Sequence, residues 1–155
     1  MLEKFGRLKN RGRLEFAAAN ENAALARMVV SAFITNSADQ KLDLTVSQLE
    51  EIKVAVSEAV SNAIIHGYSG DRTKTVALNL WHYEEALVME IEDKGIGIAD
   101  IDQAMVPSFS TKEDRMGLGF AFMSSFMDRV EVESEPGHGT MVRLMKRLPI
   151  EDEYL

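Results

Sequence analysis

Hydrophobic and polar positions follow two different periods along the chain, and the change of period separates helices from strands. In residues 20–35 apolar side chains recur every three or four positions, the period of an amphipathic helix, with Asn20 as a plausible N-cap. Arg27 falls away from this apolar stripe and is therefore expected to be exposed. The polar run 36–39 is expected to end the helix. The stripe consists of Leu25, Met28, Val29 and Ala32.

A second helical pattern begins near Thr45 and continues to residue 66. Two overlapping pairs have the spacing of a capping box, Thr45 with Gln48 and Ser47 with Glu50, so the start of the helix is left open between them. Gly67 is expected to end the helix as a C-terminal glycine. The stripe expected to be buried consists of Leu49, Ile52, Val56, Ala59, Val60 and Ala63.

After residue 70 the period changes to two, which is typical of half-buried strands. The short link HYEE between two such segments predicts an antiparallel hairpin. Residues 14–17 are expected to open the fold as a short strand. The alternating positions are Val76, Leu78 and Leu80 in the first segment and Leu87, Met89 and Ile91 in the second.

The second half of the chain contains a long irregular stretch, residues 99–116, before the pattern becomes regular again. A loop of this length is more often a functional lid than a simple connection. A helix is expected at 118–128, followed by strands at 130–133 and 140–148 that the sequence SEPGHG joins. This order of elements predicts an α+β fold, with a mostly antiparallel sheet and helices over one face.

Composition narrows the class of protein. A chain of 155 residues, 46% hydrophobic and 27% charged, has the size and balance of one globular domain. A net charge of -8 argues against direct binding to nucleic acid, and no apolar run reaches the roughly 20 residues of a membrane helix. With no cysteine and no signal peptide, a cytoplasmic protein is expected. Residues 1–12, which are rich in Lys and Arg, are expected to be flexible, and 150–155 to be frayed.

Several common phosphate and metal motifs are absent from the sequence. There is no P-loop signature GxxxxGK[ST], and the two GxG segments lack the third glycine of a dinucleotide-binding turn. The sequence has neither HRD nor DFG of the protein kinases, and no HExxH or other set of zinc-ligand spacing. Nothing of the GxSxG type supports a serine hydrolase.

What remains is a series of short motifs, the first of which lies on the second helix. Glu58, Asn62 and His66 are spaced four residues apart, so they share one helix face. A carboxylate is a potential base and an amide oxygen is a ligand suited to magnesium, although such a pair by itself is more often a solvated face. D-x-G-x-G at 93–97 follows a strand. Its carboxylate could accept a hydrogen bond from an exocyclic amine, and its glycines would let a ring approach the backbone.

The remaining motifs are each unremarkable alone. G-x-G at 117–119 is expected to open a helix, where free amides attract phosphate, with the hydroxyls and cation of Ser110, Thr111 and Lys112 just before it. Gly139 and Thr140 follow at the last hairpin and are compatible with ordinary hairpin chemistry. Their order along the chain is the informative property.

E-x-x-x-N on a helix, D-x-G-x-G after a strand, G-x-G and then G-T resemble the GHKL ATPases, which share the Bergerat nucleotide-binding fold. Within them, VSEAVSNAIIHGY, PSFSTKEDRMGLGF and FMSSFMDRVEVES resemble the anti-sigma F family of endospore-forming bacteria over residues 14–148. The departures are a longer basic N-terminus, extra residues at 36–44 and a short lid between residues 112 and 115.

The resemblance implies a two-layer α/β sandwich and specific roles. Glu58 would be the general base, Asn62 would ligate Mg²⁺, and Asp93 would read the adenine amino group of ATP. Arg27 would contact protein partners, while His66 is left open between packing at the helix end and a phosphate-side role. Gly95, Gly97 and Thr140 would shape the adenine pocket, and Thr111, Lys112, Arg115, Gly117 and Gly119 would form the lid and phosphate cradle.

The function that the resemblance implies is an ATP-dependent anti-sigma factor that is also a protein-serine kinase. Such a protein binds a sporulation sigma factor, phosphorylates a serine of an anti-anti-sigma antagonist, and acts as a homodimer. Three alternatives stay open: the catalytic domain of a histidine kinase, a nucleotide-dependent binding module without phosphotransfer, and a stress-response anti-sigma kinase. All three histidines lie inside the expected fold and no upstream helix pair carries a phospho-accepting histidine, which disfavours the first alternative.

Overall fold

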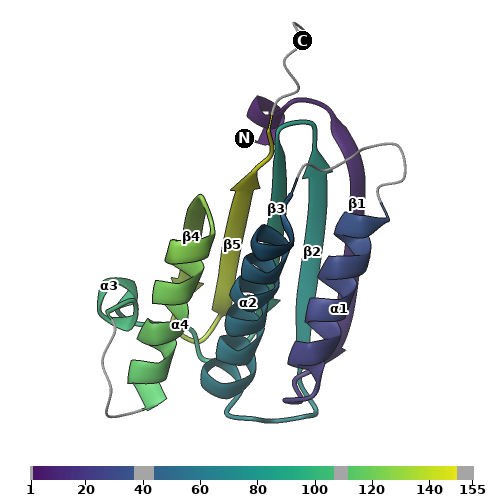
Figure 1. Cartoon of the computed structure of the whole chain (residues 1–155). Coiled ribbons are helices and arrows are strands. Elements are labelled where there is room, and N and C mark those ends of the chain that lie inside the picture. Colours follow the sequence, from purple (N-terminus) through teal and green to yellow (C-terminus); the bar gives the residue numbers. More distant parts are fainter. Residues whose placement is uncertain (1, 37–43, 107–111, 150–155) are drawn as a thin grey trace, which may run out of the picture.

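Five antiparallel strands form one sheet in the order β1-β2-β3-β5-β4, and the long helices cover one of its faces (Figure 1). The structure is a computed structural model, which describes residues 2–36, 44–106 and 112–149. The expected α+β class, with a mostly antiparallel sheet and helices on one side, is confirmed. The strands are β1 (Leu8–Ala17), β2 (Thr75–Tyr83), β3 (Ala86–Asp93), β4 (Arg129–Glu135) and β5 (Gly139–Arg147). The helical elements are η1 (Leu2–Phe5), α1 (Asn22–Thr35), α2 (Val46–Asn62), η2 (Ala63–Gly67), α3 (Ile101–Ala104) and α4 (Lys112–Phe126).

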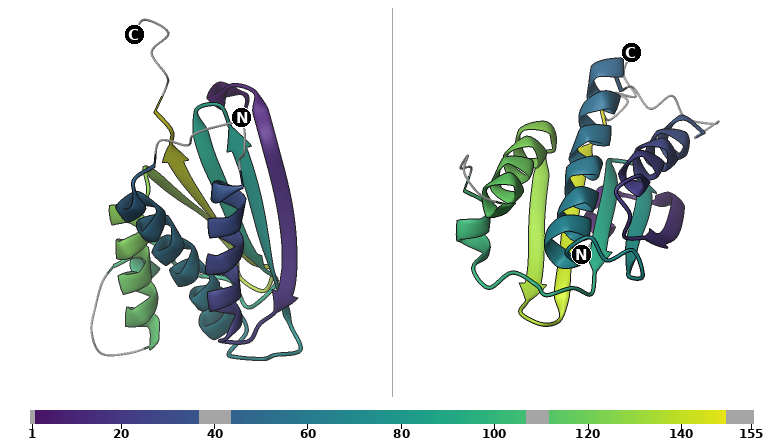
Figure 2. Two further views of the ribbon diagram at one scale, coloured as in Figure 1. Left: turned by 45° about the vertical axis from the view of Figure 1, so that its right-hand side comes forward. Right: turned by 90° about the horizontal axis from the view of Figure 1, so that it is seen from below.

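The main core lies between the sheet and the helices. Helix α2 lies between α1 and α4 and contacts both, and the views of Figure 2 show all three on the same side of the sheet. Successive strand residues point to opposite faces, so alternate positions of β2, β3 and β5 enter this core. Register pairs such as Leu80 with Met89, and Met89 with Leu144, place apolar side chains side by side beneath α2.

The start of α1 differs from the expectation. Asn20 is not the N-cap: the helix begins at Asn22, and the cap residue Glu21 makes no side-chain capping hydrogen bond. Instead, Asn22 donates from Nδ2 to the carbonyl oxygen of Ala17, 2.8 Å away. The turn is therefore held by a bond back to β1, which a local capping pattern does not reveal.

The expected apolar stripe of α1 was largely wrong, since Leu25, Met28 and Ala32 are exposed and Val29 alone of its members packs against the core. Leu25 is 37% exposed and Met28 is 69% exposed, whereas Arg27 is only half-exposed and donates to Ser57 Oγ at 2.6 Å. Small residues form much of the buried face because they let α1 approach the sheet and α2 closely. The buried residues of α1 are Ala23, Ala26, Val30 and Ile34.

Helix α2 begins with one of the two capping boxes that the sequence allowed. Thr45 and Gln48 form a reciprocal capping box, with Gln48 N–H donating to Thr45 Oγ1 at 3.1 Å and Thr45 N–H to Gln48 Oε1 at 2.9 Å. The expected stripe is confirmed, with Leu49 partly buried and the others buried. The structure thus resolves the ambiguity in favour of Thr45.

Gly67 does not end the helix as a C-terminal glycine. The chain passes from α2 into one π-helical turn, η2, in which Tyr68 N–H bonds to Ala63 O five residues earlier at 3.1 Å. The left-handed residues come later, at Ser69 (φ 52°) and Gly70 (φ 74°). A glycine is needed at position 67 because there is no room for a side chain: a Cβ there would lie 2.8 Å from Asp93 Cγ.

The N-terminal residues, expected to be flexible over 1–12, form η1 and the first half of β1. Strand β1 pairs with β2 from Leu8 onwards, so it is longer than the segment 14–17 that was expected. Phe5 of η1 is 8% exposed and packs against Tyr83, with ring centroids 6.1 Å apart. The sequence signal was weak because β1 alternates between exposed and half-buried positions. The expected frayed tail, 150–155, lies outside the described residues.

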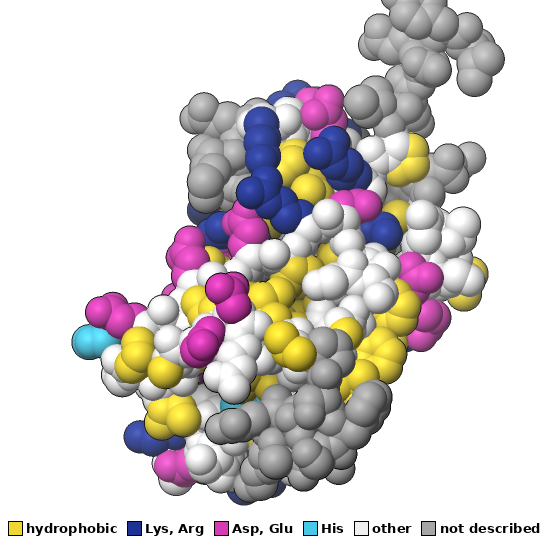
Figure 3. All heavy atoms as spheres, turned by 90° about the vertical axis from the view of Figure 1, so that its left-hand side faces the viewer, with side chains coloured by type: hydrophobic (Ala, Val, Ile, Leu, Met, Phe, Trp, Pro, Cys, Tyr) yellow, Lys and Arg dark blue, Asp and Glu magenta, His cyan; other side chains and the backbone are white. Residues whose placement is uncertain are grey.

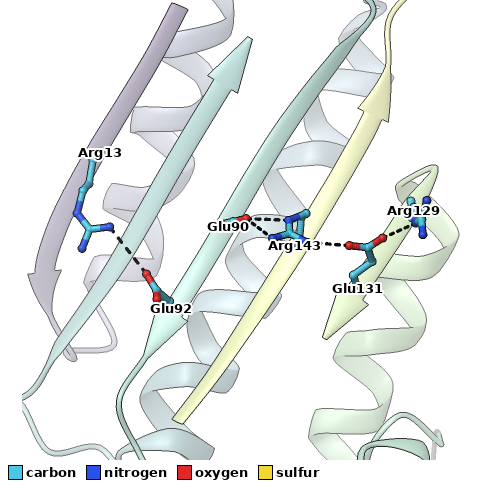
Figure 4. A network of polar contacts seen from close by, with 6 residues as sticks. All are labelled: Arg13, Glu90, Glu92, Arg129, Glu131 and Arg143. Carbon is cyan, nitrogen blue, oxygen red and sulfur yellow. Dashed lines mark hydrogen bonds and ion pairs between the residues drawn. The ribbon is translucent and has the colours of Figure 1, made fainter. Parts of the chain in front are cut away.

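The face of the sheet away from the helices carries ion pairs (Figure 4). Arg143 bonds Glu90 at 2.7 Å and Glu131 at 2.9 Å, and the side chains of Arg143 and Glu90 are each 15% exposed. Arg13 lies 3.8 Å from Glu92, where both side chains are about half exposed. Positions 90 and 92 point outwards because their neighbour in β3, at position 91, points into the core.

The stretch 99–116, expected to be irregular, is partly helical. Asp100 caps α3 by accepting from Gln103 N–H at 3.1 Å. Helix α4 already begins at Lys112, six residues before the expected start, and ends at Phe126. Residues 107–111 lie outside the described part. In the described ranges, no helix has the length and apolar character needed to cross a membrane.

Candidate nucleotide site

A pocket opens at the lower end of the sheet in Figure 1, where α2 ends and β5 begins. Its polar lining comes from Asn62, His66, Asp93 and Thr140, which lie far apart in the sequence. Three of the predicted motifs are therefore brought together by the fold. Its apolar walls are Ala59, Ala63, Ile91, Ile98, Met116, Phe120 and Val142, which suit the faces of a flat ring.

Asp93 lines this pocket and is buried, with an exposed fraction of 7%. Its Oδ1 accepts a hydrogen bond from Gly95 N–H at 2.9 Å. Burial raises the pKa of the Asp93 carboxyl to about 6, while the backbone amides of Gly95 and Thr140 act in the opposite direction. Above this pKa the carboxyl is an acceptor only, as recognition of an amino group requires.

The glycines around Asp93 are needed because backbone segments approach one another closely. A Cβ at Gly95 would lie 2.0 Å from Gly67 O, and Ile96 N–H donates to the same oxygen at 3.1 Å. Gly97 has φ +74°, and a Cβ there would lie 2.2 Å from Glu135 O. The end of η2, the loop after β3 and the β4–β5 turn are thus packed without side chains between them.

Two residues that support this loop were not identified from the sequence. Tyr68 accepts a hydrogen bond from Lys94 N–H at 2.6 Å and donates to Thr75 O at 2.8 Å. Ser134 contacts Ile98 and Thr140, both of which line the pocket. A tyrosine that follows a glycine at a helix end, and a serine in a strand, are common, so the sequence carried no specific signal for either.

Glu58 and Asn62 face α4 at the position of Gly119. A Cβ at Gly119 would lie 3.0 Å from Glu58 Oε2 and 3.4 Å from Asn62 Nδ2. Burial raises the pKa of the Glu58 carboxyl. Asn62 Nδ2 is buried, and among the described residues it has no hydrogen-bond partner. The absence of a side chain at residue 119 lets the backbone of α4 lie close to both polar groups.

Not every predicted residue lines the pocket. Of the residues that the structure describes, Glu58, Gly95, Gly117 and Gly119 lie outside its lining, next to residues that belong to it. Residues 117 and 119 lie inside α4, so their amides are not at its first turn as expected, where free N–H groups occur. The reason is that the helix starts upstream of them. Thr111 lies outside the described residues, as do the side chains of Lys112 and Arg115.

The surface beside α4 is partly hydrophobic. Phe122 is 39% exposed and stacks on Phe126 with ring centroids 6.0 Å apart, and Val106 is 59% exposed. Figure 3, viewed from the side of α3 and α4, shows hydrophobic side chains at the surface, with Lys and Arg gathered toward one end of this face. Val106 and Phe122 thus add apolar area to the described surface beside α3 and α4.

Arg27 belongs to a different surface. It lines a shallow groove between α1 and α2 with Met28, Thr35 and Lys53, away from the pocket that contains Asp93. Its bond to Ser57 places it next to the residue that precedes Glu58. The groove and the nucleotide pocket are thus connected through α2.

Comparison with known proteins gives one family. Residues 16–146 match the model of the histidine kinase-like ATPase domain, which makes this an ATPase-type, ATP-binding domain. The chain is 43% identical over 143 residues to anti-sigma F factors of Clostridium perfringens strain SM101 and Bacillus subtilis strain 168. These alignments cover 91% of this chain and 99% and 94% of those proteins, respectively.

A solved structure agrees with the fold. The crystal structure of the RsbU and RsbW domains of a Mycobacterium tuberculosis protein superposes with a TM-score of 0.64 at 17% identity, covering 90% of this chain and 33% of that one. At this identity the likeness concerns the fold alone. The sequence matches are much closer, and by them the chain belongs to the anti-sigma F factors, within the histidine kinase-like ATPases.

Proposed function

We propose that this protein uses ATP to phosphorylate a serine of an anti-anti-sigma antagonist, and that it binds and inhibits a sporulation sigma factor. The observation that carries the proposal is the alignment of polar groups along α2 and η2. Glu58 and Asn62 lie against Gly119 of α4, and Asn62, His66 and Asp93 line one pocket. This order matches the order of parts along a nucleotide, with the base at Asp93 and the phosphates toward Glu58.

Asp93 would accept a hydrogen bond from the adenine amino group, and Gly95, Gly97 and Thr140 would form the surrounding end of the pocket. Asn62 fits a magnesium ligand because its side-chain amide lines the pocket and its oxygen is a hard donor. Mg²⁺ usually takes only one or two protein ligands together with phosphates. When bound, it would neutralise phosphate charge. The role of His66 is proposed to be on the phosphate side, since it lines the same pocket.

Glu58 would take the proton from the serine hydroxyl of the antagonist. Its pKa is raised by burial, which makes the carboxylate a stronger base than an exposed one. Thr111, Lys112, Arg115, Gly117 and Gly119 would form the lid and phosphate cradle, for which the lid would have to change from the helical arrangement described above. A homodimer and partner contacts through Arg27 complete the proposal.

The experiment is transfer from labelled ATP, with magnesium, to candidate anti-anti-sigma proteins. We expect label on a serine, and Glu58→Ala should reduce the rate at least about 100-fold while ATP affinity stays within about threefold. Glu50→Ala is the matched control, since Glu50 lies two turns earlier on the same helix and its side chain is 59% exposed. Retained transfer by Glu58→Ala would refute its role as base, and label on histidine would refute the proposed chemistry.

The same assay separates the alternatives. A nucleotide-dependent binding module would bind ATP and the sigma factor but give no labelled antagonist. A stress-response anti-sigma kinase would label a different antagonist, with the same dependence on Glu58. Loss of sigma-factor binding in Arg27→Ala, with unchanged ATP binding, would support the groove between α1 and α2 as the partner surface.

A further inference from the structure

Ser134 on β4 makes three polar contacts with one hydroxyl group. Its Oγ lies 2.7 Å from Ile98 N, 2.9 Å from Gly139 O and 2.8 Å from Thr140 Oγ1. Ser134 is half-buried and does not itself line the pocket, whereas Ile98 and Thr140 do. The hydroxyl thus lies directly behind the pocket wall.

The directions of these hydrogen bonds follow from what each atom can do. A backbone N–H only donates and a carbonyl oxygen only accepts, while a hydroxyl has one proton and two lone pairs. Ser134 therefore accepts from Ile98 and donates to Gly139, which uses its only proton. For the third contact to be a hydrogen bond, Thr140 must donate to Ser134. The reverse assignment would leave Ser134 Oγ and the Gly139 carbonyl oxygen 2.9 Å apart with no proton between them.

This assignment determines what Thr140 can offer to a ligand. Its proton points to Ser134, so toward the pocket the hydroxyl presents lone pairs only. Thr140 is paired with Asp93 across β5 and β3, and the Asp93 carboxylate is also an acceptor above its pKa of about 6. Two neighbouring side chains therefore present acceptors at the same end of the pocket. An amino group at this end of the pocket can donate hydrogen bonds to these acceptors. A carbonyl oxygen in the same place would face two acceptors and find no donor.

We propose that Ser134 is a positioning residue that determines base specificity, because it holds the Thr140 hydroxyl as an acceptor. The pocket then takes 6-aminopurine nucleotides and rejects 6-oxopurine nucleotides. The inference rests on the proposed nucleotide function and adds the residue that sets its selectivity. Ser134 acts through Thr140 and does not contact the base.

The test compares the binding of ATP and ITP to the full-length protein at pH 8. Their bases differ at C6, which bears an amino or an oxo group, and at N1, which accepts a hydrogen bond in adenine and carries a proton in hypoxanthine. We expect wild type to prefer ATP. In Ser134→Ala the Thr140 hydroxyl is free to turn its proton into the pocket. The ratio of the affinity for ATP to the affinity for ITP should therefore fall about tenfold. ITP affinity should rise in absolute terms, which distinguishes this effect from general damage, since damage lowers both affinities. Ser134→Thr, which keeps the hydroxyl, should retain the wild-type preference.

A second variant keeps the proposal testable if Ser134→Ala does not fold. Thr140→Val removes the hydroxyl but leaves the hydrogen bonds of Ser134 to Ile98 and Gly139. It should lower the affinity for ATP more than the affinity for ITP. In the Thr140→Val background, Ser134→Ala should no longer change the preference. The inference would be overturned if Ser134→Ala had a lower or unchanged affinity for ITP. It would also be overturned if Thr140→Val lost more affinity for ITP than for ATP. Equal wild-type affinity for ATP and ITP would overturn it while leaving the proposed function intact, whereas no ATP binding at all would overturn both.

Discussion

Asp93 is expected to destabilise the nucleotide-free protein at neutral pH. Its pKa rises from 3.8 to about 6 on folding, because burial disfavours the charged carboxylate. The folded state therefore holds the proton more tightly than the unfolded state. Stability is unaffected below pH 3.8, falls as pH rises toward 6, and levels off above it. A difference of about two pH units corresponds to a cost of about 3 kcal/mol at pH 7.5.

Asp93→Asn removes this ionisation. The absolute stability of the variant also depends on its hydrogen bonds to the amides of Gly95 and Thr140, which an asparagine satisfies less well. The way in which the stability difference changes with pH does not depend on those hydrogen bonds. The difference in unfolding free energy between variant and wild type should therefore increase by about 2.5 kcal/mol from pH 4 to pH 7.5, in favour of the variant. Urea denaturation at several pH values, without nucleotide, measures it.

The control for this experiment is Asp71→Asn. Asp71 is exposed, and hydrogen bonds from Thr73 lower the pKa of its carboxyl below 3.8. The pH dependence of this variant should therefore have the opposite sign and lie mostly below pH 4, so that its difference from wild type stays nearly constant from pH 4 to pH 7.5. A difference for Asp93→Asn that does not change with pH would refute the reasoning, because it would mean that Asp93 does not titrate in this window. The same variant should lose ATP binding, so stability and function would be opposed at this residue.

Two further variants test the packing around the site and the sheet. Gly119→Ala should change stability by no more than about 1 kcal/mol, since alanine favours the helix and the Glu58 side chain can shift, yet it should abolish phosphoryl transfer. Retained transfer would show that a residue without a side chain is not needed next to Glu58 and Asn62. Arg143→Leu should cost about 2–3 kcal/mol by leaving Glu90, 15% exposed, without its partner. Arg72→Leu should cost much less, because its ion pair with Glu21 is exposed. Equal costs in chemical denaturation would contradict this ranking.

Much of the architecture could be predicted from local patterns. The change of period from helical to alternating located the β2–β3 hairpin, whose loop is the two residues Glu84 and Glu85. The stripe of α2 and a capping box at its start, at Thr45 or Ser47, could be predicted because each depends on side chains a few positions apart in the same helix. Glu58 and Asn62 were assigned to one helix face for the same reason. The order of the short motifs then indicated the family before any contact was known.

Only the tertiary structure decided which surfaces meet. Alanines, rather than Leu25 and Met28, form much of the buried face of α1, because burial depends on how closely a neighbouring element can approach. The raised pKa of Asp93 comes from burial between η2, β3 and β5, which are distant in sequence. Ser134 became visible as a residue of the site only when its bonds to Ile98 and Thr140 were seen. Periodicity is a property of neighbours along the chain, whereas desolvation and hydrogen-bond direction are properties of neighbours in space.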